Sequence, residues 1–446
     1  MTSTNKRIFY ASQSIHLQPV STGLNGNHRT PDQYFRYGDG GDDSTTTSPG
    51  PGKWIYPRGL QSAGISTTFN TSPVSQLGTL QLYSQTETVP QVEVTLNKVL
   101  DGTAPLYSLC TASIDNDNHD RIYASNKDLT EITNNMVNVR LAVFSDTTTL
   151  ATGSTESHTY CSNMYLSRVT YSFPVEGAAT EEVTLLGSNK FWGTGAHIPA
   201  QLDNPATPSG NEQNSPQGFG ASYVVRRQHL ALQATGLGDT YPGRGADGKI
   251  VLSAITNSVL AKSSILPTGF GGIPINLQEN VGFFKVPIIQ NITISADLGR
   301  ENINELGYFG PYFKYTTFPI EVTSEFQVVS TYGDLINADD FNDKVGCSAS
   351  SYSNLQPHEI VIKICGTTPN DALYIDLGKK NKLTSVNYAG GDTGGGNTTT
   401  TYSFQTFNKL NIIPTGVYAA YVSFTDAPTN DGVISAEYGP TVEFLQ

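Results

Sequence analysis

The sequence predicts an all-β (mainly β) fold, with two tandem domains plus extended arms and loops. Composition, strand-like alternation and an internal repeat predict this fold. Of the 446 residues, 37% are hydrophobic and 15% are charged, with 43 Gly and 24 Pro. This composition is typical of β proteins with long loops. Only three residues are Met, and runs of strong helix formers are few, which argues against extensive helix.

The internal repeat relates residues 61–90 to residues 290–319 without a gap, at an offset of 229. About two identities would be expected from ordinary residue frequencies. Eight of the thirty positions are identical: Gln61/Gln290, Ile65/Ile294, Ser66/Ser295, Leu77/Leu306, Gly78/Gly307, Tyr83/Tyr312, Thr88/Thr317 and Pro90/Pro319. The alternative explanation is two Ser/Thr-rich strand pairs that are alike only in composition.

The strands that flank the repeat favour duplication, because they occur in the same order in both copies. Residues 91–99 and 320–329 both alternate apolar and polar side chains with the period of a half-buried strand. Residues 166–171 and 383–388 share the pattern Leu-Ser/Thr-x-Val-x-Tyr. The strands predicted before these are 137–144 and 359–365, and those predicted after them are 181–186 and 401–407.

The repeat divides the chain into five segments. Two domains are predicted, separated by a Gly/Pro-rich excursion, preceded by an extended arm and followed by C-terminal strands. The arm is 1–56, the first domain 57–195, the excursion 196–280, the second domain 281–414 and the C-terminal strands 415–446. A strand is predicted in 8–20, a strand or helix in 249–261, short helices at 126–135 and 333–345, and a Gly-rich hairpin tip at 389–400.

The excess negative charge lies in the two predicted domains. The net charge is −13; residues 57–195 carry 13 Asp and Glu against 7 Lys and Arg, and residues 281–446 carry 17 against 9. Binding to a nucleic-acid backbone needs Lys and Arg. This excess of acidic over basic residues therefore argues against a nucleic-acid-binding protein, but it is compatible with a surface along which DNA moves without binding.

We predict no metal or cofactor site. The run DNDNHD (115–120) lacks the Gly and the distal Glu of an EF-hand, so a solvated loop is favoured over a metal site built from Asp115, Asp117, His119 and Asp120. The acidic run at 37–43 is interpreted as part of the arm. Residues 236–245 have neither GxGxxG nor GxxxxGK spacing, which argues against a nucleotide loop.

We also predict no catalytic centre. The seven His residues are scattered, and no hydrolase, metalloprotease or kinase signature occurs. The paired carboxylates Glu181–Glu182 and Asp339–Asp340 are predicted to be solvated. The four cysteines lack CxxC spacing, so reduced thiols are expected, with disulfides as the alternative: Cys110, Cys161, Cys347 and Cys365. Because no apolar run approaches roughly 20 residues and MTSTNKRIFY has no signal-peptide core, we expect neither membrane insertion nor secretion.

The run QNITISADLGRENINELGYFGPYFKYTTFPIEVTSEFQVV (290–329) resembles the tail tube (major tail) proteins of long-tailed bacteriophages. The resemblance covers about 45 residues well and, through the repeat, about 270 residues loosely. The first copy keeps Leu77, Gly78, Tyr83 and Pro90 but lacks the Arg and the Pro–Tyr pair. The residues that carry it are Ile294, Arg300, Glu305, Leu306, Gly307, Pro311, Tyr312, Pro319, Glu321, Val322, Glu325 and Phe326.

The resemblance implies two tandem β-sandwich or barrel-like tail-tube domains, each with a short flanking helix. Such domains close into rings, with an inner β-barrel around a DNA-conducting lumen and long loops between stacked rings. A duplicated chain is then expected to form a homotrimeric ring with pseudo-sixfold symmetry. The implied partners are further copies of the chain, the tape measure, terminator, baseplate and sheath proteins, and double-stranded DNA that passes without specific binding. The implied location is the tail of a virion that is assembled in the host cytoplasm, with no enzyme activity and no cofactor.

Two alternatives belong to other classes of protein. Another β-rich virion protein, such as a baseplate, decoration or adhesin component, would share the composition but not the repeated strand order. A β-sandwich carbohydrate-active enzyme could hold carboxylates far apart in sequence. It would be expected to carry a signal peptide and exposed Trp, whereas this chain has two Trp residues, Trp54 and Trp192.

Overall fold

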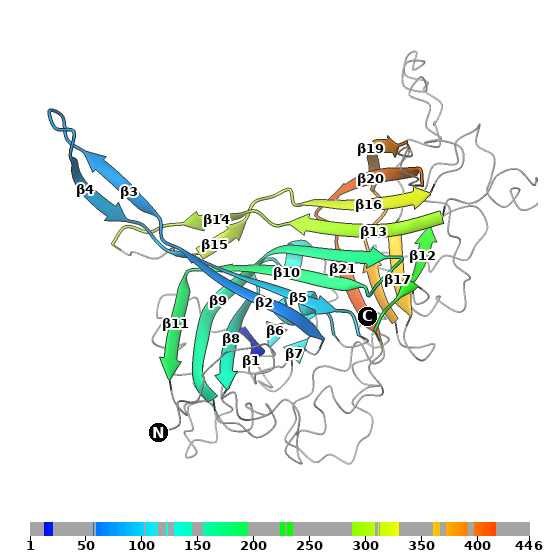
Figure 1. Ribbon diagram of the computed structural model, residues 1–446, viewed down its shortest axis with the longest axis horizontal. Coiled ribbons are helices and arrows are strands. Elements are labelled where there is room, and N and C mark those ends of the chain that lie inside the picture. The colour runs from blue at the N-terminus through cyan, green and yellow to red at the C-terminus, as the bar shows by residue number, and fades with distance from the viewer. Residues whose placement is uncertain are drawn as a thin grey trace, which may run out of the picture.

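The structure, a computed structural model, consists mainly of antiparallel strands (Figure 1), which confirms the predicted all-β fold. Helix is confined, within the described residues, to α2 (Leu106–Cys110) and α3 (Leu129–Ile132). Helix α3 falls inside the helix predicted at 126–135, and α2 was not predicted. The structure describes residues 13–20, 57, 59–101, 104–111, 113–114, 122–123, 129–144, 155–194, 224–227, 230–234, 288–307, 311, 313–329, 360–365, 372–390 and 397–415.

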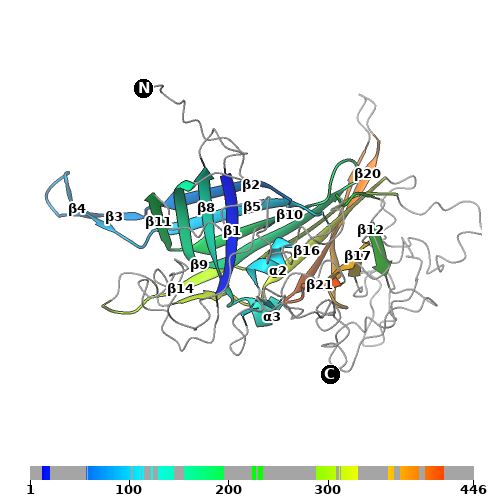
Figure 2. The same cartoon turned by 90° about the horizontal axis from the view of Figure 1, so that it is seen from below.

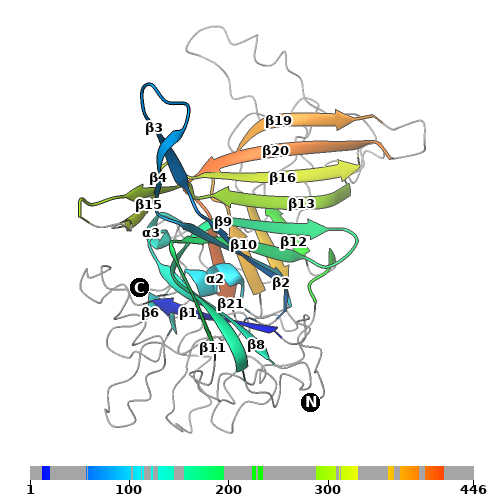
Figure 3. The same ribbon diagram turned by 60° about the vertical axis from the view of Figure 1, so that its left-hand side comes forward.

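Eight strands form one long antiparallel sheet, in the order β19–β20–β16–β13–β9–β10–β5–β2 (Figure 3). The strands of its first half are β2 (Leu60–Thr68), β5 (Gln91–Val99), β9 (Thr155–Pro174) and β10 (Thr180–Gly187). Those of its second half are β13 (Ile288–Asp297), β16 (Glu321–Val329), β19 (Lys382–Ala389) and β20 (Thr399–Phe407).

The two halves of this sheet have the same strand order. We call β2–β5–β10–β9 unit one and β13–β16–β20–β19 unit two; they join through the pairing of β9 with β13. Among the described strands, β2 and β19 are the two edges of the eight-stranded path. A hairpin follows the first strand of each unit, and both hairpins extend to the left in Figure 1. They are β3 (Thr71–Ser75) with β4 (Leu82–Glu87), and β14 (Arg300–Ile303) with β15 (Phe313–Thr316).

The strand register is also repeated. Ile65 lies opposite Val94 in unit one, and Ile294 lies opposite Ser324 in unit two. A β-bulge interrupts both of these strand pairs at the same place, between residues 60 and 62 and between residues 289 and 291. A second bulge recurs just after Leu166 in the β9–β10 pair and just after Leu383 in the β19–β20 pair. The residue numbers of equivalent positions therefore differ by 229 between β2 and β13 and by 217 between β9 and β19.

A second layer of strands covers one face of the long sheet (Figures 1 and 2). Under unit one it comprises β1 (Gln13–Val20), β8 (Met136–Phe144), the first part of β9 and β11 (Asn189–Thr194). Under unit two it comprises β12 (Leu230–Ala234), β17 (Ile360–Cys365), β18 (Ala372–Asp376) and β21 (Asn411–Thr415). A short pair, β6 (Ser113–Ile114) and β7 (Ile122–Tyr123), lies outside these sheets.

The two units differ in how the chain passes between the layers. In unit one, β9 continues through both layers as a single strand of 20 residues. In unit two, residues 377–381 separate β18 from β19. Gly378 there has a φ of +74°, and the Asn381 side-chain amide donates hydrogen bonds to the carbonyl oxygens of Leu377 and Gly378. These bonds hold the bend that replaces the continuous strand.

Strands from outside the two predicted domains complete the second layer. β1 lies within the segment predicted as the N-terminal arm and pairs with β8 of unit one. β12 lies within the predicted excursion and pairs with β17 of unit two. β21 reaches Thr415, where the predicted C-terminal segment begins. The remainder of 1–56 and 415–446, most of 196–280, the predicted helix at 333–345 and residues 391–396 of the predicted hairpin tip lie outside the described residues.

The hydrophobic core lies between the two layers. Alternate residues of β5 and β16 are buried, and each fully buried aliphatic or aromatic side chain stabilises the fold by about 1.5–3 kcal/mol. These buried residues include Val92, Val94, Leu96, Val322, Phe326 and Val328. The residues between them face away from the core. Neither of the two described helices has the length or the apolar character needed to cross a membrane.

Candidate functional site

The face of the long sheet that points away from the core is lined by hydroxyl, amide and carboxylate side chains; we call it the polar face. Cross-strand pairing aligns these side chains in rows that run across both units. The Ser295 and Thr323 hydroxyls share a hydrogen bond of 2.7 Å in one row. That row consists of Asn97, Glu182, Thr170, Ser295, Thr323 and Gln405.

The charged side chains on the polar face are mainly acidic. Within the eight described strands of the long sheet, this face carries five carboxylates and two cations. The carboxylates are Glu93, Glu182, Asp297, Glu321 and Glu325, and the cations are Arg168 and Lys382. The polar face therefore offers a phosphate backbone uncharged hydrogen-bonding groups and net negative charge rather than a binding surface of Lys and Arg.

The internal junction between β9 and β13 buries the apolar side chains at the edges of both units. Residues 291–297 pair with residues 168–174. Just beyond them, the backbone N–H of Leu298 donates a 2.7 Å hydrogen bond to the carbonyl oxygen of Ser167. Leu298 and Tyr171 are both 0% exposed. The junction is thus a continuous, closed part of the core.

The equivalent residues at the two outer edges of the sheet are exposed. Phe69 corresponds to Leu298 and is 75% exposed, and Tyr388 corresponds to Tyr171 and is 52% exposed. Strand β2 carries no charged residue along its length. Natural edge strands usually carry charges or other features that prevent further pairing. The β2 edge therefore has the chemistry of an interface rather than that of a protected edge, whereas β19 carries one charge, Lys382, at its start.

Arg300, at the base of the second hairpin, fastens unit two to unit one. Its guanidinium donates hydrogen bonds to the carbonyl oxygen of Leu166 (2.9 Å from Nε) and to that of Thr133 (2.6 Å from Nη2). It also lies 5.2 Å from the centre of the Tyr165 ring. Burial lowers the pKa of Arg300 to about 10.

Lys314 adds a second link at the same place, because its Nζ donates a 3.1 Å hydrogen bond to the carbonyl oxygen of Gly187 in unit one. Burial, together with the nearby charge of Arg300, lowers the pKa of Lys314 to about 8. We call Arg300 and Lys314 the hairpin clamp. All three main-chain acceptors named for it, at Leu166, Thr133 and Gly187, belong to the first repeat.

Within the described residues, the first hairpin has no equivalent clamp. The offset of 229 places Thr71 at the position of Arg300 and Gln85 at that of Lys314. These two side chains are exposed, and the Gln85 amide donates a 2.7 Å hydrogen bond to the Thr71 hydroxyl. The two hairpins therefore differ in the chemistry that could fix them to a neighbouring unit.

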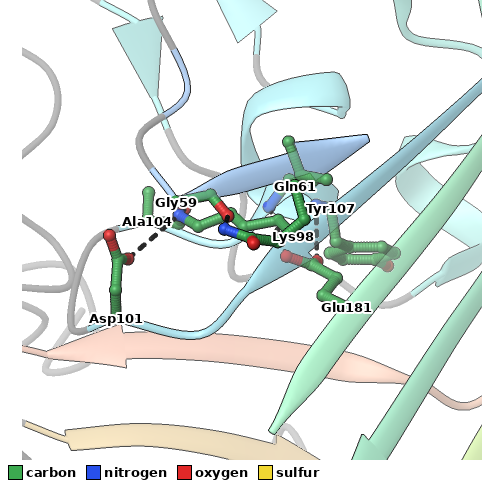
Figure 4. Close-up of polar contacts among 8 residues, drawn as sticks. Gly59, Gln61, Lys98, Asp101, Ala104, Tyr107 and Glu181 are labelled. Carbon is green, nitrogen blue, oxygen red and sulfur yellow. Dashed lines mark hydrogen bonds and ion pairs between the residues drawn. The ribbon is translucent and has the colours of Figure 1, made fainter. Parts of the chain in front are cut away.

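A buried polar cluster lies behind unit one, where Glu181 of β10 faces the first turn of α2 (Figure 4). The Glu181 carboxylate accepts hydrogen bonds from the backbone N–H groups of Leu106 (2.6 Å) and Tyr107 (2.8 Å) and from the Tyr171 hydroxyl (2.8 Å). Burial raises the pKa of Glu181, although these hydrogen bonds and Lys98 act in the opposite direction. The cluster fixes α2 against the sheet.

Lys98, directly across the strand pair from Glu181, is also fully buried. Its ammonium group donates a 2.6 Å hydrogen bond to the carbonyl oxygen of Ala104 and lies 3.4 Å from the Asp101 carboxylate. The sequence prediction that both Glu181 and Glu182 are solvated is therefore wrong for Glu181. The period of two was the missed signal, because Glu181 shares its face with the buried residues Val183 and Leu185.

The tips of both hairpins present leucine side chains to solvent. Leu77 and Leu306, which the repeat aligns, are fully exposed, and each precedes a glycine with positive φ. The φ values are +92° for Gly78 and +91° for Gly307, a backbone conformation that favours glycine. The repeat thus extends to the backbone of the hairpin tips.

The described residues contain no group of three or more His, Cys, Asp or Glu side chains that could hold a metal ion. Cys110 and Cys161 are buried free thiols; burial raises the pKa of Cys110, and it raises that of Cys161 to about 11. The sequence runs 37–43, 115–120 and 236–245, the segment 249–261, the pair Asp339–Asp340, and Cys347 lie outside the described residues.

Comparison with known proteins gives no family assignment: the chain matches none of the protein-family models and none of the curated proteins compared.

Proposed function

We propose that this chain is the subunit of a bacteriophage tail tube, a structural virion protein whose rings stack around a lumen that conducts DNA. One observation carries the proposal: two units of identical strand order are joined edge to edge, and no described strand pairs with the matching edges at the two ends of the sheet. Repeating the internal junction between chains continues the sheet, and closure of the sheet into a barrel removes its edges.

The size of the barrel favours a ring of several chains. With strands about 4.8 Å apart and tilted by about 40°, closing one eight-stranded sheet on itself gives a barrel about 16 Å across, which side chains fill. Three chains of eight strands each give 24 strands and a barrel about 48 Å across on the same geometry. Only the larger barrel leaves room for a DNA duplex.

The chemistry of the sheet supports the same assignment. The core lies under the other face, so the polar face becomes the lining of the barrel. Its Ser, Thr, Asn and Gln side chains are uncharged, and the surplus of carboxylates repels phosphate groups over the roughly 8–10 Å at which salt does not screen them. Such a lining lets a polyanion slide without binding.

On this proposal the chain has no enzyme activity. It acts in the tail of a virion assembled in the host cytoplasm, together with tape measure, terminator, baseplate and sheath proteins. Electron microscopy of the purified chain, with mass measurement, tests it. The expected result is rings or tubes with a repeating mass of about 144 kDa, three times the 48.0 kDa of one chain. Rings of six chains, or a chain that stays monomeric at every concentration and salt tested, would contradict it.

A further inference from the structure

The internal junction gives a template for the contact between two chains. In β13 and β9, Ile294 lies opposite Tyr171, Ser295 opposite Thr170 and Asp297 opposite Arg168. The offsets of 229 and 217 come from paired residues and bulges that recur in both units, so they relate backbone positions as well as sequence. They place each residue of β2 opposite a definite residue of β19 in another copy.

We propose that β2 of one chain pairs antiparallel with β19 of a second copy of the chain, in the register of the internal junction. This places Ile65 opposite Tyr388, Ser66 opposite Asn387, Thr67 opposite Val386 and Thr68 opposite Ser385. The proposal rests on the proposed function for its biological setting, and it adds to that function the partner surface and the register.

The residue types that meet in this register are compatible. On the core side, Ile65 meets Tyr388 and Thr67 meets Val386, so half-exposed apolar surface on one edge covers apolar surface on the other. On the polar side, Ser66 meets Asn387 and Thr68 meets Ser385, which continues the uncharged polar face without opposing like charges.

Phe69 adds a specific anchor at the end of β2. Its counterpart Leu298 is completely buried at the internal junction, and the N–H of Leu298 bonds to the carbonyl oxygen of Ser167. The same geometry places the N–H of Phe69 against the carbonyl oxygen of Thr384 in the second copy. It also covers the phenyl ring, which is 75% exposed in the single chain.

A shift by one residue would not preserve this match. It would place Ile65 of one chain opposite residues on the polar face of the second chain, because directly opposite side chains lie on the same face of a sheet and side chains alternate along each strand. Pairing of two β2 edges, or of two β19 edges, would leave the other edge of each chain open and could not close a ring.

Disulfide trapping tests the register. Directly opposite residues have Cα atoms about 4.5–5.5 Å apart, which a disulfide can span, whereas diagonal neighbours are about 7–8 Å apart. We expect Ser66→Cys combined with Asn387→Cys to give, on mild oxidation, covalent species of up to three chains. The wild-type chain, in which Cys110 and Cys161 are buried, serves as the background control.

Three further variants make the result specific. Thr68→Cys with Ser385→Cys is a second opposite pair and is expected to crosslink equally. Ser66→Cys with Ser385→Cys is the misaligned control and is expected to crosslink at least tenfold less. Ser66→Cys alone is expected to give no dimer. Efficient crosslinking of the misaligned pair or of the single variant would overturn the register.

The outcomes also separate this inference from the proposed function. Tubes visible by electron microscopy without crosslinking of either opposite pair would refute the register and leave the tube assignment standing. Closed covalent trimers in a preparation that forms no tubes would support the register and count against the tube. Far-ultraviolet circular dichroism that matches the wild type confirms that each variant is folded.

Discussion

We predict that Arg300→Lys weakens the junction between the two units, because Arg300 is the central residue of the hairpin clamp. Lysine keeps the buried positive charge, but it cannot reach the carbonyl oxygens of Leu166 and Thr133 together as the planar guanidinium does. The free-energy cost of desolvating the charge therefore remains, while at least one of the short hydrogen bonds that offset this cost is lost. A buried carbonyl oxygen of the first repeat is left without the donor that Arg300 supplies.

The expected cost follows from those contacts. A hydrogen bond to a charged group contributes about 1.5–3 kcal/mol, and leaving a buried acceptor unsatisfied adds a cost of similar size. We expect the junction between the two units to lose about 3 kcal/mol, roughly a hundredfold in its opening equilibrium. Arg168→Lys is the matched control, because Arg168 is exposed on the polar face nearby and its replacement should change stability by less than about 0.5 kcal/mol.

Hydrogen exchange is the suitable assay, because it reports the opening of the junction separately from unfolding elsewhere in the chain. The amide groups of residues 292–298 report on the junction directly, since they lie in and just after the strand that pairs with β9. Arg300→Lys should lower their protection by about two orders of magnitude while the amides of β17 stay protected. Loss of less than about 1 kcal/mol, or equal loss in Arg168→Lys, would refute the reasoning.

Three other outcomes are expected. Because Lys314 has its pKa lowered to about 8 from 10.5, the open state binds more protons between these values, so stability against urea should rise as pH goes from about 8 toward 10. Lys314→Met should remove that part of the rise, and an unchanged profile would contradict the assignment. Glu181→Gln should lower the free energy of unfolding, followed by thermal unfolding, by about 2 kcal/mol. The reason is that the NH₂ group of the glutamine must face one of the groups that donate hydrogen bonds to the Glu181 carboxylate. Glu182→Gln should change the free energy of unfolding by less than about 0.5 kcal/mol. If the chain forms the proposed tail tube, replacing Glu321 and Glu325 together by Lys should leave the tubes intact but slow DNA ejection; unchanged ejection would argue against an acidic lining.

The sequence predicts the repeated unit because its signals are local. Alternation along residues 91–99 and 320–329 identifies β5 and β16, and the shared pattern ending in Tyr171 and Tyr388 identifies equivalent strands. The gapless alignment stops being accurate after Pro319. Buried Val92 corresponds to Val322, so the offset is 230 there, and only the cross-strand pairs make this clear.

The pairing of distant segments was not predictable in the same way. Nothing in the local sequence of residues 230–234 identifies β17 as their partner, and the long strand β9 extends well before its predicted start at residue 166. Strand pairing depends on non-local contacts, which a reading of local periodicity does not contain. The role of Arg300 is non-local for the same reason: its acceptors at Thr133 and Leu166 lie 167 and 134 residues away.

The two kinds of junction differ in chemistry in a way that fits how each would form. At the internal junction, the chain tethers unit two to unit one at high effective concentration, which helps to offset the desolvation of Arg300 and Lys314. At the proposed junction between chains, each association would have to overcome that desolvation without a tether. There Thr71 and Gln85 replace the two cations, and the contact relies on backbone pairing, on apolar surface at Ile65 and on the Phe69 ring. An uncharged contact of this kind can form between separate subunits at a lower desolvation cost. The charged clamp therefore lies at the internal junction, where the covalent link between the units helps to offset the desolvation of its two cations.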